Sequence, residues 1–585
     1  MASPAARIAF VLLTLTSCLL AASTWQVYSN TWDEPEHLAA GIELLDRGRY
    51  EYDTEHPPIA RIFMALGPYL AGAHSYGTPP PDGVQEGIDI LYTDGHYDTF
   101  LTLARLGTLP WLAVLLLATW FWARRLTESE GEALLAVLLV ASVPPILGHA
   151  ALATLDVAAA ATVLLALYAL QCWWDSGRWR DAVFAGITAG IAVGSKFSAV
   201  PFLILGFVIL GAAQGVLSRR ERPGATDAKS PSADQHAAGG APALPMSPLR
   251  RRISGIAIVA FTALVPLFIV YAPLSSAQSS IDHRYDLAVG FLLHERGLSH
   301  AAGELLGHIW LPHWAKGAVE GIVAIKAHND TGHLSFLLGE LRSTGWWYFY
   351  LVGLAVKTPL PLLATSPIGL AVLAREGWLT RDGWRLAPPL LFLTVLLFAS
   401  SFSQINIGIR HILVLYPFMA LGGAHVVTLV WQSLRKATVR PLAIVGSALL
   451  VGLVGWQAST LWTANPDYLP YFNEAVAHPA KVLVDSDLDW GQDLRRLERR
   501  AAEIKIPLLN LAYRGTADLA REALPPYVVM PPWKPVTGWV AISALAKEHD
   551  PKGYAWLEAY KPMEWIGKTI KLYYIPSRDG QHAGG

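Results

Sequence analysis

The stretch DEPEHLAAGIELLDRGRYEYDTEHPP, residues 33–58, follows the first apolar segment of the chain and concentrates acidic residues and histidines beside it. A carboxylate at the edge of a membrane is costly unless it has a partner or a task. This stretch is therefore the first place to look for a functional site, and the rest of the sequence is interpreted around it.

Two amphipathic helices are predicted around the acidic stretch. Asp33 precedes Pro35 and can cap the first helix, and Pro57 precedes the second. Apolar residues then recur at helical spacing: Leu38, Ile42 and Leu45 in the first helix, and Ile59, Ile62, Phe63, Leu66 and Leu70 in the second. We expect both helices to lie on the membrane surface, with Asp33-Glu34 and Glu55-His56 facing water at their N-terminal ends. The plainer interpretation is that these charges only cap helices or sit in solvated loops.

The composition is typical of a polytopic membrane protein. The chain has 585 residues, a formal net charge of -1, 53% hydrophobic residues and a mean hydropathy of +0.35. Charged residues make up 16%, which is below the share of about a quarter found in soluble domains. The near-neutral charge gives no support for nucleic-acid binding. These values disfavour a soluble enzyme.

Windows of about 17–25 residues predict about eleven transmembrane helices. The apolar segments lie near residues 8–24, 101–123, 133–148, 152–173, 182–194, 199–217, 253–273, 346–373, 386–401, 412–431 and 442–461. Loops rich in arginine, such as Arg124-Arg125 and Arg250-Arg251-Arg252, fall on one side of these spans, and the positive-inside rule makes that side cytoplasmic. The acidic stretch then faces the extracytoplasmic side.

Two domains are predicted. Residues 1–464 form the transmembrane domain, with outer loops 25–100 and 275–345 and a disordered cytoplasmic linker at 218–248, which is rich in Pro, Ala, Gly and Ser. Residues 465–585 form a small extracytoplasmic α/β domain. Its predicted strands are 482–484, 508–512, 539–542 and 570–574, and its predicted helix is 494–504.

Five ionisable residues lie within or at the ends of predicted spans: Asp156, Lys196, Lys357, Arg410 and His411. Such residues are functional candidates, because burying a charge without a partner is expensive. The alternative is that they snorkel to the surface or form structural ion pairs, for example Asp156 with Lys196. As a set, most of them are predicted near the outer surface, where the acidic stretch also lies.

The chain resembles the polyprenyl-phosphate-sugar-dependent glycosyltransferases of the GT-C superfamily. Within that superfamily, it resembles the branch of protein O-mannosyltransferases and aminoarabinose transferases. This branch is similar to glycosyltransferase family 39. The matching motifs occur in the family's order: Asp33-Glu34-Pro35-Glu36-His37-Leu38, Glu55-His56-Pro57-Pro58, Thr154-Leu155-Asp156, Gly194-Ser195-Lys196-Phe197, Lys357-Thr358-Pro359-Leu360-Pro361, Gly408-Ile409-Arg410-His411 and Asp489-Trp490-Gly491-Gln492-Asp493. Each motif alone is weak, but together they are specific.

The resemblance implies transfer of a hexose or pentose from a polyprenyl-phosphate donor to a protein, lipid or glycan hydroxyl, with inversion. It assigns the catalytic base to Asp33 and makes Glu34, Glu55 and His56 candidates for base support, acceptor positioning or metal binding. Some related enzymes have Lys where this chain has His56. It also implies an uncleaved first helix, although Ala21-Ala22-Ser23 resembles a signal-peptidase site, and a place in the bacterial inner membrane.

The residue types fit that chemistry independently. A donor phosphate needs cations, for which Lys196, Arg410 and Lys357 are candidates, with Asp156 and His411 beside them. An acceptor hydroxyl needs a carboxylate base. No cofactor is required, although a divalent cation would suit an Asp-x-Asp pair. Such pairs occur at Asp485, Asp487 and Asp489, but these residues more simply cap a helix at 490–498.

Two other classes of function fit a chain with many spans. A transporter or flippase would also carry charges within its membrane segments, although these charges are predicted at one surface instead of the midplane. A non-catalytic lipid-binding scaffold is the third class. Sugar transfer by the purified protein distinguishes the enzyme from both.

The predicted topology can be tested by cysteine labelling from either side of the membrane. A cysteine at Asp53 should react with an impermeant reagent from the extracytoplasmic side, and one at Lys436 only after the membrane is opened, because the basic loops face the cytoplasm. Labelling of position 53 from the cytoplasm alone would reverse the orientation and place the acidic stretch in the wrong compartment for the mechanism above.

Overall fold

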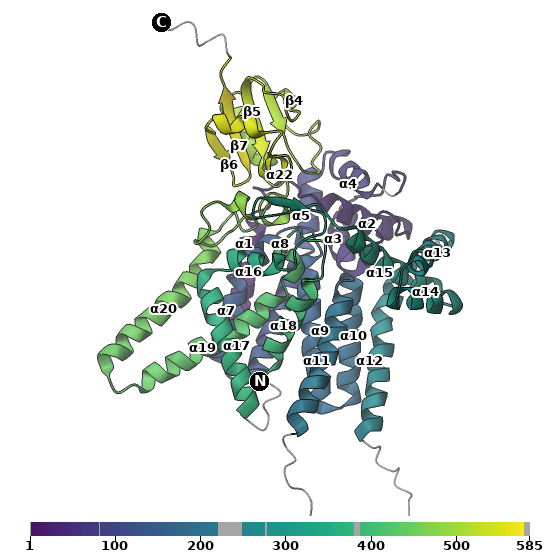
Figure 1. The fold of residues 1–585 in the computed structure, drawn as a ribbon, viewed down its shortest axis with the longest axis vertical. Helices are drawn as coiled ribbons and strands as arrows, with labels where there is room; N and C mark the ends of the chain where they lie inside the picture. The colour runs from purple at the N-terminus through teal and green to yellow at the C-terminus, as the bar shows by residue number, and fades with distance from the viewer. Residues whose placement is uncertain (1, 81, 220–247, 275–277, 380–385, 578–585) are drawn as a thin grey trace, which may run out of the picture.

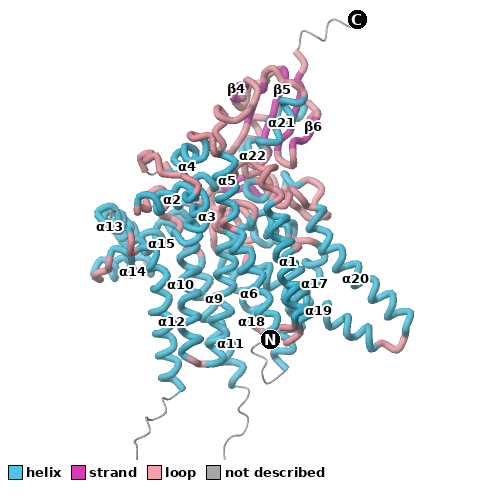
Figure 2. Tube along the Cα trace, turned by 180° about the vertical axis from the view of Figure 1, so that it is seen from behind, coloured by secondary structure: helices cyan, strands magenta, loops and turns pink. Residues whose placement is uncertain are grey.

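The computed structural model describes residues 2–80, 82–219, 248–274, 278–379 and 386–577. Residues 220–247 of the predicted linker lie outside this range. Within it, long apolar helices run side by side in a bundle, surface helices cover one end of the bundle, and a β-sheet lies beyond them at that same end (Figure 1). The other end of the bundle is where α1 begins (Figure 2).

The bundle contains a helix for each of the predicted spans. These helices are α1 Pro4–Ala22, α6 Leu109–Thr127, α7 Glu130–Ala141, α8 Pro144–Ala150, α9 Asp156–Ser176, α10 Trp179–Ser195, α11 Ala199–Arg219, α12 Pro248–Tyr271, α16 Phe349–Lys357, α17 Leu360–Leu379, α18 Pro388–Ser400, α19 Leu415–Lys436 and α20 Arg440–Thr463. Within the described ranges, five helices are long and apolar enough to cross a membrane, and α7 with α8 and α16 with α17 would each add one if a bent pair counts as one span. The count of about eleven stays a prediction.

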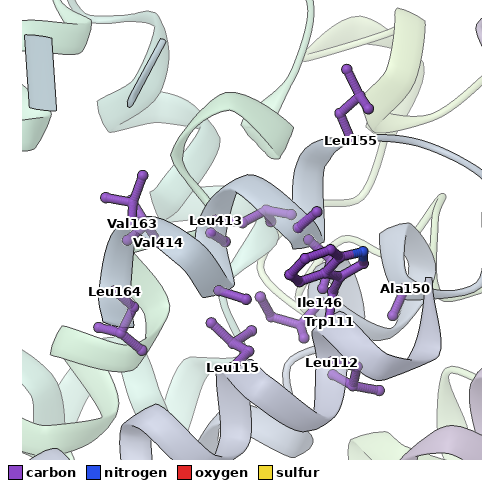
Figure 3. Packing of buried hydrophobic residues seen from close by; sticks show 14 of the residues in the cluster. Trp111, Leu112, Leu115, Ile146, Ala150, Leu155, Val163, Leu164, Leu413 and Val414 are labelled. Atoms are coloured by element: carbon purple, nitrogen blue, oxygen red, sulfur yellow. The ribbon is translucent and has the colours of Figure 1, made fainter. Parts of the chain in front are cut away.

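The bundle packs through small residues where helices cross closely. A Cβ on Gly190 of α10 would overlap the carbonyl oxygen of Ala263 in α12, and one on Gly369 of α17 would overlap that of Gly422 in α19. Small residues let helix backbones approach, which is how helices associate when no water drives them together. Figure 3 shows part of the buried hydrophobic cluster, which includes Trp111 near the start of α6, Ile146 of α8 and Leu413 just before α19.

The helices outside the bundle form a cap over its end. They are α2 Glu34–Arg47, α3 Pro58–Leu70, α4 Gly83–Tyr92, α5 Tyr97–Leu106, α13 Gln278–His294, α14 Leu298–His308 and α15 His313–Thr331, followed by the hairpin β1 Ser335–Leu337 and β2 Glu340–Arg342. The two predicted amphipathic helices are therefore confirmed as α2 and α3. The expectation that α2 lies on the membrane surface stays a prediction; α2 contacts α3 and α4, and most of its residues are buried within the protein.

The C-terminal region folds around a five-stranded sheet of order β4-β3-β5-β7-β6. Its elements are β3 Leu509–Ala512, β4 Tyr527–Val529, β5 Gly538–Ser543, β6 Glu564–Ile566 and β7 Ile570–Ile575, with helices α21 Leu494–Glu503 and α22 Ala544–His549. Strands β4, β3 and β5 are parallel, whereas β7 runs antiparallel to β5 and β6. Alternate residues of β5 face two apolar clusters, one containing α21 residues and the other α22 residues.

Most of the secondary structure predicted for this region is confirmed. The predicted strands at 508–512, 539–542 and 570–574 are β3, β5 and β7, and the predicted helix is α21. The strand predicted at 482–484 is wrong, because this apolar segment is irregular and packs beneath the sheet, with Leu483 buried in the bundle core. The short strands β4 and β6 were missed.

A buried ion pair fixes the start of α2 against the bundle. The Glu34 carboxylate accepts hydrogen bonds from Arg105 Nε and Nη2 at 2.7 and 2.8 Å and from the backbone N–H of Ala153 at 2.8 Å. Arg105 also donates to the carbonyl oxygen of Ser29 at 2.8 Å. Glu34 was predicted to face water as a catalytic candidate. Instead it is 1% exposed and joins α2 to α5 and to the segment before α9.

Removing this pair should destabilise the fold without touching any surface charge. Glu34→Gln leaves the buried Arg105 guanidinium without a carboxylate, and loss of one partner from a buried pair costs about 3–5 kcal/mol. We expect a clear fall in the unfolding temperature in detergent. The control is Asp98→Asn, which breaks an exposed pair with Arg495 and should change little. Equal unfolding temperatures for the two variants would contradict the structural role of Glu34.

Candidate active site

A cavity of about 720 Å³ lies where the cap, the bundle and the C-terminal sheet region meet. The acidic stretch supplies one wall, Asp156 at the start of α9 and Lys196 at the end of α10 supply the floor, and residues 405–411 supply another wall. Residues after β3 and in α22 complete the lining on the sheet side. The cavity therefore collects residues from widely separated parts of the chain.

Four charged side chains form a continuous series across the cavity. Arg410 Nη1 donates to Asp33 Oδ2 at 2.5 Å and lies 3.7 Å from Asp156 Oδ2, and Lys196 Nζ donates to Asp156 Oδ1 at 2.7 Å. The Asp33 side chain is 22% exposed, whereas Arg410 is 7% and Asp156 is 1% exposed. Asp33 is thus the member of the series most accessible to a molecule in the cavity.

Asp33 does not cap α2 as predicted, because its side chain makes no hydrogen bond to the helix N-terminus. It is bound to Arg410 instead. The ion pair of Asp156 with Lys196, which was the structural alternative for those two residues, is present. Both residues nevertheless line the cavity, so the pairing does not remove them from the site.

Several polar groups at the floor have no hydrogen-bond partner among the described residues. They are Arg410 Nε, Asp156 Oδ2 and His411 Nε2, and all three residues line the cavity. Buried polar groups in native proteins are nearly always hydrogen-bonded, so a group of unpartnered ones deserves an explanation. An anionic ligand at Arg410 would supply the missing acceptor for Nε.

Trp490 closes the site above Arg410. The guanidinium carbon of Arg410 lies 4.4 Å from the centre of the Trp490 ring. The His149 ring packs against Trp490 in an edge-to-face arrangement, with the two ring centres 5.9 Å apart. Trp490 is held in place by its carbonyl oxygen, which accepts from the backbone N–H of Trp32 at 3.1 Å. The ring orients the arginine and excludes water from its face.

The second half of the acidic stretch is organised by Asp53 and Arg61, neither of which was predicted. Arg61 is fully buried, forms an ion pair with Asp53 and donates to Tyr50 Oη at 2.6 Å. Burial opposes ionisation of Asp53, but Arg61 and then His56 hold its pKa below the usual range. Asp53 also contacts His56 Nδ1 at 3.1 Å, which turns that imidazole toward the cavity.

Glu55 faces α15. Its carboxylate contacts His328 Nδ1 at 2.7 Å, and this hydrogen bond raises the pKa of His328. Glu55 and His328 both line the cavity and both are about one-third exposed. This contact therefore joins the acidic stretch to α15, which lies in the predicted outer loop 275–345.

Two further carboxyl groups line the cavity and have a high affinity for protons. Burial, and then the nearby Asp53 charge, raises the pKa of Glu36 to about 8. Burial raises the pKa of Asp485 to about 7, although Arg410 acts in the opposite direction. Asp33, Glu36 and Asp485 thus form a carboxyl-rich wall beside Arg410.

Two predicted site residues are not in the cavity. Glu34 is locked to Arg105, and Lys357 donates to the carbonyl oxygens of Leu469 and Asp487 at 2.9 and 2.5 Å. Lys357 therefore fixes the segment that leads to Trp490, and the expectation that it contacts a donor phosphate is corrected. A lysine within an apolar segment correctly indicates a buried charge with a partner. Here the partners are backbone carbonyl oxygens.

The acidic triplet near residue 487 does not cap a helix as predicted. Helix α21 begins at Leu494, and the triplet side chains bind other segments. Asp487 accepts from the backbone N–H of Ile409 at 3.1 Å, and Asp489 accepts from that of Leu545 at 2.7 Å. Within the described ranges, no group of three His, Cys, Asp or Glu side chains is arranged to hold a metal ion.

The fold and the site agree with the resemblance seen in the sequence. Residues 101–221 match the family model for dolichyl-phosphate-mannose-protein mannosyltransferases. A search of curated protein sequences gives no match. The resemblance to GT-C glycosyltransferases that the motifs indicated is therefore confirmed, with the family match limited to this one segment of the chain.

Solved structures show the same architecture. The Saccharomyces cerevisiae protein O-mannosyltransferase Pmt1-Pmt2 complex bound to the sugar donor is similar at 11% sequence identity and a TM-score of 0.53, covering 90% of this chain and 94% of that one. ArnT from Cupriavidus metallidurans bound to undecaprenyl phosphate gives 12% identity and a TM-score of 0.46, covering 96% and 97%. The protein has a GT-C-like fold, and several of its described helices are long and apolar enough to cross a membrane.

Proposed function

We propose that the protein transfers a sugar from a polyprenyl-phosphate donor to an acceptor hydroxyl in this cavity. The observation that carries the proposal is Arg410, which pairs with the accessible carboxylate of Asp33 while its own Nε has no partner among the residues that the structure describes. A base and an anion-binding group are thus joined in one cavity. The family match and the likeness to a mannosyltransferase complex that was solved with its sugar donor support this choice of chemistry.

The donor phosphate binds at the floor of the cavity in this proposal. Arg410 and Lys196 are the cations there, and charge-assisted hydrogen bonds to phosphate are among the stronger polar contacts in proteins. Apolar residues of α9 and its neighbours continue from these cations: Ala159, Ala160, Val163, Phe202, Leu413 and Val414. The pocket that they line measures about 10 Å³, so the first isoprene units of the lipid would have to widen it.

Asp33 is the base in this mechanism. Its carboxylate takes the proton of the acceptor hydroxyl while that oxygen forms a bond to the anomeric carbon of the sugar. The bond from that carbon to the phosphate oxygen breaks on the opposite face, so the configuration inverts. The electron pair stays on polyprenyl phosphate, where Arg410 and Lys196 stabilise the charge. A phosphate that draws Arg410 away from Asp33 would raise the proton affinity of the base.

The site faces the extracytoplasmic side of a bacterial inner membrane in this proposal. The support is the distribution of arginine in the loops, since the cavity lies at the end of the bundle opposite the start of α1 (Figure 2). The acceptor then comes from outside the cell or from the outer leaflet.

Asp33→Asn tests the base. This variant keeps the shape and a hydrogen-bond acceptor for Arg410 but removes the proton acceptor, so single-turnover transfer with saturating donor should fall by about 100-fold or more while donor binding persists. Asp82→Asn is the matched control, because Asp82 caps α4 outside the cavity. Its transfer rate and unfolding temperature should stay near those of the native protein.

Near-normal transfer by Asp33→Asn would exclude Asp33 as the base, and Glu36, Asp485 and Glu55 would be the remaining carboxyls to test. A purified native protein that binds donor yet transfers no sugar to any cell-envelope extract would instead favour a flippase or a scaffold. Mass spectrometry of native glycans before and after deletion of the protein would identify the sugar and the acceptor.

Arg410→Gln and Lys196→Met test the phosphate site. Each removes one charge-assisted contact worth about 1.5–3 kcal/mol, so binding of undecaprenyl phosphate should weaken by about tenfold or more. Arg495→Gln is the control, since Arg495 pairs with Asp98 outside the cavity and should not affect binding. Unchanged lipid binding in both cavity variants would assign Arg410 and Lys196 a structural role only.

A further inference from the structure

The C-terminal sheet region contributes its own residues to the cavity. Arg514 follows β3, and Leu545 and His549 belong to α22, which follows β5. Strands β3 and β5 are adjacent and parallel, so both segments leave the sheet at the same carboxyl edge. In open parallel sheets, ligands bind outside this edge, and here it borders the cavity.

Arg514 differs from the other cations that line the cavity. Lys196 is paired with Asp156, Arg410 with Asp33, and Arg284 lies 3.7 Å from Glu320. In the part of the chain that the structure describes, no carboxylate lies within ion-pair distance of Arg514, and its side chain is exposed. Arg514 is therefore the cavity cation whose charge is still available to an incoming anion.

Two histidines add hydrogen-bonding groups around Arg514. His549 and His333 both line the cavity, and His549 Nε2 is buried without a hydrogen-bond partner among the described residues. Burial, followed by the positive charges of Arg514 and His333, lowers the pKa of His549 to about 4. A neutral imidazole beside an unpaired guanidinium can donate one N–H to an anion that the guanidinium attracts.

The position of α22 is fixed independently of any ligand. The Ser543 hydroxyl caps the helix by accepting from the backbone N–H of Ala546, and Asp489 accepts from the N–H of Leu545. Asp489 immediately precedes Trp490, whose ring covers Arg410. Helix α22, which contains His549, is thus hydrogen-bonded to the segment whose Trp490 covers Arg410.

We infer that Arg514, His549 and His333 form an anion-binding subsite that holds a phosphate or carboxylate group of the acceptor while its hydroxyl reaches Asp33. This inference rests on the proposed function and adds the chemical class of the acceptor, a hydroxyl compound that carries a negative charge. The floor of the cavity keeps the donor phosphate on Arg410 and Lys196, and the sheet side supplies a second cationic position. The C-terminal region is then part of the substrate-binding machinery.

The subsite can be probed with simple anions on the full-length protein in detergent. The protein is first saturated with undecaprenyl phosphate, and binding of inorganic phosphate or of acetate is then measured by NMR line broadening of the anion. Binding should persist in the lipid-saturated native protein, should weaken about tenfold or more in Arg514→Gln, and should be partly retained in Arg514→Lys. Arg495→Gln should bind as the native protein does. Preference for phosphate or for acetate identifies the group recognised.

A second measurement separates this inference from the proposed function. Transfer to the native acceptor in membranes should slow in Arg514→Gln while undecaprenyl phosphate binding stays unchanged. Anion binding that disappears on saturation with the lipid, or that is equal in Arg514→Gln and the native protein, would overturn the subsite. Failure of the native protein to bind undecaprenyl phosphate would overturn the proposed donor while leaving anion binding at Arg514 to be judged separately.

Discussion

The site depends on the position of one buried arginine. Arg410 contacts Asp33 at the start of α2, lies beside Asp156 at the start of α9, and is covered by Trp490 from the segment before α21. A charge this deeply buried is stable only where several groups surround it. The cap, the bundle and the C-terminal region therefore converge on a single guanidinium, and the cavity forms at that point.

The contacts around the cavity show how buried charges are neutralised by ion pairs. Glu34 and Arg105 neutralise each other behind α2, and Arg61 neutralises Asp53 behind the second half of the acidic stretch. The Glu34–Arg105 pair lies outside the cavity lining, whereas Asp53 lines the cavity, and both pairs hold their neighbours in place. Asp33 and Glu55 remain partly exposed because the adjacent carboxylates, Glu34 and Asp53, carry the structural pairing. Adjacent residues of one motif thus have different tasks.

Much of the fold could be predicted from local patterns, whereas the pairings in the site could not. Helices α2 and α3 follow from proline positions and apolar spacing, and β5 follows from a short continuous apolar run. The partner of Asp33 is 377 residues away in the sequence, and spacing holds no information about it. The distinction between Lys357, which binds backbone carbonyls, and Lys196, which lines the cavity, also needs the three-dimensional structure. Arg61 could have been predicted from the sequence as a site residue, because an arginine within the apolar helix 58–70 indicates a buried partner.

The closing of the site by Trp490 has a consequence for biosynthesis. Chains emerge from the ribosome from the N-terminus, and their early parts fold while later parts are still being made. Asp33, Asp156, Lys196 and Arg410 all precede residue 490 in the sequence. A nascent chain that ends before residue 490 therefore has these charged residues without the aromatic ring that covers Arg410. Completion of the cavity requires the C-terminal region to dock on the bundle and the cap.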